Sequence, residues 1–101
     1  MVCEEKTYPK EKGYLKKLID NMAEMQKWDV SSIQGDRSGR DVMVCCQRLY
    51  GLRHEYTITI HGEQNASLVR IETDDAGGKT AIFRQFLLLE KLIAFDEGRT
   101  T

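Results

Sequence analysis

The sequence predicts a small α+β domain, a two-layer sandwich in which two helices pack on one face of a four-stranded antiparallel meander. The predicted order of elements is α-β-β-β-β-α. Apolar residues recur at helical spacing near both ends of the chain, whereas the middle alternates apolar and polar residues as strands do. No helix separates the strands, and their connections are short, which favours antiparallel neighbours. The 101 residues fit a single domain.

The first helix is expected between Pro9 and Lys27. Proline suits the first turn of a helix, although Gly13 would also allow a later start. One apolar stripe follows at three- and four-residue steps, made of Leu15, Leu18, Ile19, Met22 and Met25. The charged segments at the two ends, residues 1–7 and 97–101, are predicted to fray.

Four strands are predicted in the middle of the chain, separated by turns rich in Gly, Asp, Asn and Ser. They cover residues 28–33, 41–49, 54–61 and 67–73. The third strand alternates strictly, and its inward residues are Tyr56, Ile58 and Ile60. The second strand is apolar on both sides, and we expect Met43, Cys45 and Leu49 on its outer face.

Residues 80–95, TAIFRQFLLLEKLIAF, form an unusually apolar helix. Thr80 is expected as its N-cap, and residues 96–98 are expected to end it. The core-facing stripe consists of Ile82, Phe86, Leu89 and Ile93. Leu88 and Phe95 fall nearly opposite that stripe. The helix therefore carries more apolar surface than one sheet face can cover, which indicates a further partner.

Charge and composition argue against several classes of protein. Fifteen Lys and Arg residues nearly balance sixteen Asp and Glu residues, so nothing electrostatic predicts nucleic acid as a partner. No segment reaches the roughly 18 apolar residues of a membrane span, and the N-terminus lacks the apolar core of a signal peptide. The three cysteines are an odd number, which favours reduced thiols and a cytoplasmic location.

The motifs that could carry chemistry are incomplete. The run from Gly77 to Thr80 ends like a phosphate-binding loop, but Thr73 replaces its first glycine, and Asp74 and Asp75 would repel phosphate. Adjacent Cys45 and Cys46 must point to opposite faces of a strand, so they cannot share a metal ion. We therefore predict no catalytic residue, no metal site and no cofactor, and we expect the protein not to be an enzyme.

The predicted order of elements resembles two groups of small domains. One is the kinase-associated domain found at the C-terminus of some protein kinases, and the other is a loose set of small bacterial α-β4-α domains. The resemblance rests on the order of the elements and on no residue motif. It therefore implies the two-layer arrangement and carries no activity or ligand to this chain.

The surplus apolar surface predicts a non-catalytic interaction or assembly module, with a homodimer or other homo-oligomer as its expected form. The candidate interface residues are Leu88, Leu92, Phe95, Met43, Leu49 and Leu68. The alternative is a pocket for an apolar or amphiphilic small molecule between sheet and helices, and its candidate residues are Trp28, Tyr56, Phe83, Phe86 and Met22. The same residues can equally fill a packed core.

Overall fold

A computed structural model describes residues 1–35, 40–49, 52–63 and 65–98. Its elements are β1 (Val2–Tyr8), α1 (Lys12–Met25), β2 (Asp29–Gly35), β3 (Arg40–Leu49), β4 (Leu52–Glu63), β5 (Ala66–Thr73) and α2 (Gly78–Gly98). The predicted α+β class, with one antiparallel sheet and two helices, is confirmed.

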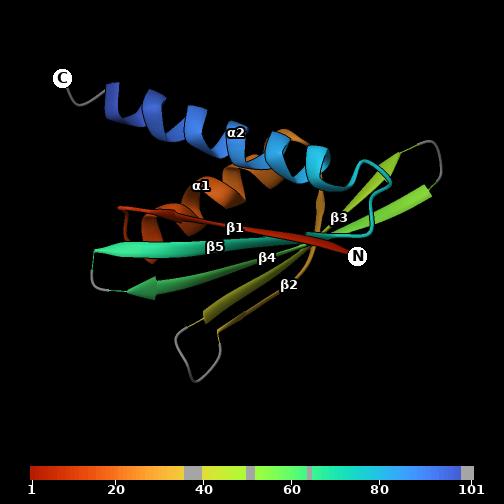
Figure 1. The fold of residues 1–101 in the computed structure, drawn as a ribbon, viewed down its shortest axis with the longest axis horizontal. Coiled ribbons are helices and arrows are strands. Elements are labelled where there is room, and N and C mark those ends of the chain that lie inside the picture. The colour runs from red at the N-terminus through yellow and green to blue at the C-terminus, as the bar shows by residue number, and fades with distance from the viewer. Residues whose placement is uncertain (36–39, 50–51, 64, 99–101) are drawn as a thin grey trace.

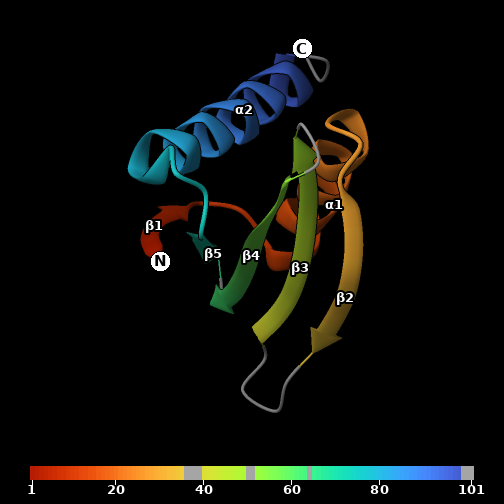
Figure 2. The ribbon, with the colours of Figure 1, turned by 90° about the vertical axis from the view of Figure 1, so that its right-hand side faces the viewer.

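The strands form one sheet in the order β1-β5-β4-β3-β2, and every neighbouring pair is antiparallel. β2 to β5 are the expected meander. α1 packs on β4 and β5, α2 packs on β1 and β5, and the helices contact each other, so both lie on the same side of the sheet (Figure 1). The strands twist strongly across the sheet, as Figure 2 shows. One apolar layer therefore separates the sheet from both helices.

The prediction of four strands was wrong, because the segment assigned to a frayed end forms a fifth strand. β1 pairs with β5 along its whole length. Its sequence VCEEKTY is rich in charge and lacks the alternation that marks a half-buried strand. Charged side chains of β1 form ion pairs with α2 at the margin of the helix layer. Glu4 lies 3.5 Å from Lys79, and Lys6 lies 3.0 Å from Glu90. A charged edge strand of this kind also discourages pairing with another chain.

The core lies where the predicted periodicities placed it in β4, β5 and α2. Ile58 pairs with Met43 on one side and with Ile71 on the other, and all three are buried. The helices contribute Leu15, Leu18, Ile19, Met22, Ile82, Phe86 and Leu89 to the same cluster. Ile93 is half-buried against it.

The expected outer face of the second strand was wrong. Met43 and Cys45 pair with Ile58 and Tyr56, which point toward the helices, and Met43 is only 2% exposed. Because neighbouring residues of a strand face opposite ways, Cys46 lies on the far side from Cys45. The two thiols thus diverge, as predicted. The side chain of Leu49 lies outside the described part of the chain.

The helix ends also differ from the prediction. α1 begins at Lys12, and it ends with a chain reversal in which Lys27 adopts a left-handed φ of 57°. The Trp28 amide donates to the carbonyl of Ala23 at 2.8 Å, which completes a Schellman motif. α2 begins at Gly78, before the expected cap at Thr80, and ends at Gly98, within the residues expected to end it.

Replacement of Phe86 by alanine should lower the free energy of unfolding by about 3–5 kcal/mol, because it leaves a cavity in a packed core. Phe83→Ala is the matched control: it removes the same atoms from the same helix at a position that is 47% exposed, so it should cost less than about 1 kcal/mol. Urea unfolding followed by circular dichroism measures both. Equal losses would contradict the orientation of α2.

Candidate functional site

Three tyrosines attach the α2 segment to the rest of the fold. Tyr8 of β1 donates to Glu90 at 2.8 Å, Tyr14 of α1 donates to Asp96 at 2.8 Å, and Tyr56 of β4 donates to Asp75 at 2.6 Å. We call these the three phenol–carboxylate bonds. They act just before the start, in the middle and near the end of α2, on both of its flanks. They therefore fix which side of α2 faces the sheet.

The pKa shifts in these pairs favour structural hydrogen bonds over acid–base chemistry. Burial and the hydrogen bond to Asp96 raise the pKa of Tyr14 to about 12, and burial with the neighbouring carboxylate also raises the pKa of Tyr8 and of Tyr56. The hydrogen bond from Tyr56 lowers the pKa of Asp75. The hydrogen bonds from Tyr8 and Lys6 likewise lower the pKa of Glu90 against the effect of burial, so Tyr56 and Tyr8 donate as protonated phenols to ionised carboxylates at neutral pH.

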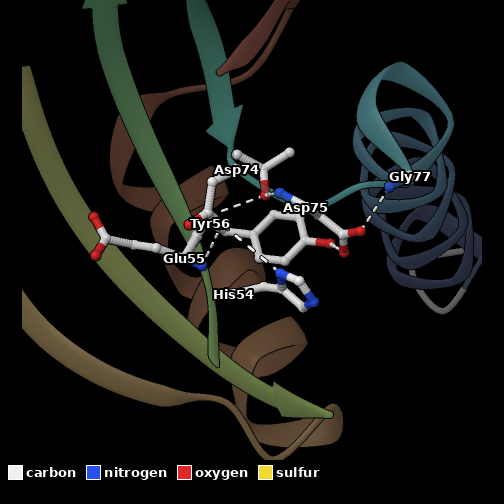
Figure 3. Close-up of polar contacts among 7 residues, drawn as sticks. His54, Glu55, Tyr56, Asp74, Asp75 and Gly77 are labelled. Atoms are coloured by element: carbon white, nitrogen blue, oxygen red, sulfur yellow. Dashed lines mark hydrogen bonds and ion pairs between the residues drawn. The ribbon is translucent and has the colours of Figure 1, made fainter. Parts of the chain in front are cut away.

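The corner between β5 and α2 holds two carboxylates with separate partners (Figure 3). Asp74 accepts from the Glu55 amide at 3.0 Å and lies 3.9 Å from Nδ1 of His54. Asp75 accepts from the Gly77 amide at 2.8 Å as well as from Tyr56. A phosphate-binding loop would offer the Gly77 amide to its ligand. Here the Gly77 amide donates to the Asp75 carboxylate of the chain itself. The corner therefore serves as the start of α2 and not as a phosphate-binding loop.

A polar cavity of about 430 Å³ opens beside this corner. It is lined by Gln26, Gln47, Tyr56, Asp75, Gly77, Thr80, Ala81, Arg84 and Gln85. Gln26 and Gln85 exchange two hydrogen bonds, of 2.8 and 3.0 Å, and so join the end of α1 to α2. The remaining amide and hydroxyl groups give the cavity a polar wall.

An apolar surface lies along the junction of the two helices. We call it the seam surface, and it consists of Met25, Leu88, Leu92 and Phe95. The three α2 residues follow one another at steps of four and three, so they share one side of the helix. Phe95 is 65% exposed and Met25 is 60% exposed, while Leu88 and Leu92 are half-buried. Asn21, Glu24, Met25 and Leu92 line an open depression of about 400 Å³.

The structure brings together only part of the predicted interface. Leu88, Leu92 and Phe95 belong to the seam surface, whereas Met43 lies in the core. Leu68 is half-buried on the other side of the sheet, where it lines a small cavity of about 180 Å³ with His61. It therefore cannot join the same contact.

Sequence reasoning missed Met25, which it assigned to the core stripe of the first helix. Its position one turn after Met22 agrees with that stripe. In the last turn of α1, however, Met22 and Ala23 are buried while Met25 lies at the margin of the buried side and is 60% exposed. A methionine in the last turn, followed by a polar reversal, was the available signal.

Most of the predicted pocket residues fill the core. Trp28 stacks on Tyr56 with ring centroids 4.6 Å apart, and both belong to the same buried cluster as Met22 and Phe86. Phe83 lies on the exposed side of α2 and does not join them. Of the five, Tyr56 also borders the polar cavity.

Metal sites, membrane spans and similar proteins give few further indications of function. Across the described ranges, no group of three or more His, Cys, Asp or Glu side chains could hold a metal ion. In that same part of the chain, neither helix combines the length and apolarity needed to cross a membrane. No protein-family model matches the chain, and no curated protein or solved structure matches it.

Replacement of Tyr56 by phenylalanine should lower the free energy of unfolding at pH 7 by about 1–2 kcal/mol, because it removes a hydrogen bond to an ionised carboxylate. The ring remains to stack on Trp28. The lowered pKa of Asp75 stabilises the fold above the unfolded-state pKa of about 3.9. This contribution is lost as the pH falls through the folded-state pKa.

The difference in stability between wild type and Tyr56→Phe should therefore shrink as the pH falls below about 4. Urea unfolding of both proteins between neutral and acidic pH measures it. A difference that stays constant over this range would contradict the role given to Asp75.

Proposed function

We propose that the chain is a non-catalytic interaction module whose contact surface is the seam surface. The observation that carries this proposal is the exposure of Phe95 and Met25 beside two half-buried leucines. A folded monomer seldom leaves large apolar side chains grouped in this way, and such groups commonly mark contacts with another protein. The depression against Leu92 offers a place for an apolar side chain of a partner.

The attachment of α2 supports this proposal. The three phenol–carboxylate bonds hold α2 on both flanks, so the helix cannot roll to bury the seam surface without breaking them. The core positions below are already filled by Ile82, Phe86 and Leu89. The exposed side chains of Phe95 and Met25 are therefore available for contact with another molecule.

The use of the titratable groups supports a non-catalytic role. Asp75 and Glu90 accept hydrogen bonds from tyrosines of other elements. Burial acts to raise the pKa of Glu90, but the hydrogen bonds from Tyr8 and Lys6 outweigh it and lower that pKa. A general acid at neutral pH needs a raised carboxyl pKa, which is the opposite shift.

Self-association is the expected form of the interaction. Symmetric dimers are the commonest assemblies that bury such surfaces. The formal net charge is only −1, so two copies repel each other weakly. Both points favour a homodimer.

Sedimentation velocity across the micromolar range tests this expectation. The wild-type protein should dimerise, and Phe95→Glu should weaken the dimer at least about tenfold, because it buries a charge in an apolar contact. Phe83→Glu is the matched control: Phe83 shares its side of α2 with Glu90, which contacts β1, and so lies away from the seam surface. A wild type that stays monomeric would contradict the proposed self-association.

A second candidate function is the binding of a small polar molecule in the cavity beside Asp75. Its lining of amides, hydroxyls, Arg84 and Asp75 favours a polar ligand over the apolar one expected from the sequence. Thermal unfolding with a panel of small carboxylates, zwitterions and sugars tests it. A shift abolished by Gln47→Ala would support the cavity, and the absence of a shift with any class would count against it.

A further inference from the structure

We infer that the partner on the seam surface is a second copy of this chain, related by a two-fold axis, with Glu24 of each copy opposite Lys91 of the other. This inference rests on the proposed function and adds the symmetry and the register of the contact. It is carried by the charges on the two sides of the seam surface.

Two opposite charges flank the apolar residues. Glu24 lies on α1 and lines the depression with Met25 and Leu92, while Lys91 precedes Leu92 on α2. Both side chains are exposed. Neither makes an ion pair with another residue in the described ranges. At the depression, the α1 side of the surface thus carries Glu24 and the α2 side carries Lys91.

Four other charged residues of α2 contrast with Lys91 because they have partners within the chain. Lys79 pairs with Glu4, Glu90 with Lys6 and Tyr8, Asp96 with Tyr14, and Glu97 with Lys10. Arg84 makes no ion pair among the described residues, but it lines the polar cavity with Asp75 at the start of α2, away from the seam surface. Lys91 is left to face outward among large apolar side chains.

With two-fold symmetry, this arrangement of opposite charges makes the surface complementary to a second copy of itself. In a two-fold contact, a group on one side of the axis meets the corresponding group from the other side of the partner copy. An axis that runs along the seam therefore places α1 of each copy against α2 of the other. The opposite charges then meet as two Glu24–Lys91 pairs. The apolar residues of the seam surface lie between these pairs. A surface with one sign of charge on both sides would instead repel its own copy.

Charge reversal tests the register. Glu24→Lys and Lys91→Glu should each weaken self-association at least about tenfold, because each variant places like charges opposite one another at both contacts. The double variant E24K/K91E should recover wild-type association, because it restores two pairs of opposite charge. An equimolar mixture of the two single variants should form a heterodimer, because every contact then joins an acid from one variant to a base from the other.

Controls separate the register from the proposed function. Lys79→Glu makes the same charge change on α2 beside β1, and it should leave self-association within about twofold of wild type. Circular dichroism shows whether each variant is folded. If the single variants associate as tightly as wild type while Phe95→Glu does not, the register is overturned and the proposed function stands. If the wild type is monomeric at all micromolar concentrations, the register and the proposed self-association are both overturned.

Discussion

The arrangement of this protein depends on how its last helix is held against the sheet. The three phenol–carboxylate bonds connect α2, or the segment just before it, to β4, β1 and α1, and two of them join residues 82 positions apart in the sequence. Apolar packing alone is non-directional and would let a helix this apolar settle in more than one rotation. A buried phenol that loses its acceptor leaves a polar group unsatisfied, so these bonds select one rotation. The seam surface is exposed as a consequence.

The same constraint explains the first strand. β1 has little apolar content of its own, and it is held by backbone hydrogen bonds to β5 and by contacts with α2. Glu90 accepts from both Lys6 and Tyr8 and so joins the edge of the sheet to the middle of the helix. β1 and α2 therefore support each other: the strand widens the surface under the helix, and the helix covers the strand.

The hydrogen bonds that hold α2 also determine which side chains are exposed to other molecules. Three carboxylates serve as hydrogen-bond acceptors inside the fold and do not form an acidic cluster with one another: Asp75, Glu90 and Asp96. The outward side of α2 keeps large apolar side chains and the exposed cation Lys91. Across the seam, α1 contributes Met25 and the exposed acid Glu24. A surface of this composition suits recognition by contact, which is the basis of the function proposed above.

The sequence by itself determined the elements whose burial repeats locally: the helical stripe of Ile82, Phe86 and Leu89, and the alternation of β4 and β5. A periodic pattern records which side of an element is buried without reference to its partners. Only the tertiary structure decided the pairing of β1, the inward face of β3 and the exposure of Met25. β1 pairs through its backbone, whose hydrogen bonds leave no mark in the side chains, and β3 is apolar on both faces, so its pattern fits either orientation. The phenol–carboxylate partners are likewise brought together only by the fold, because no local spacing relates a tyrosine to an acid 82 residues away.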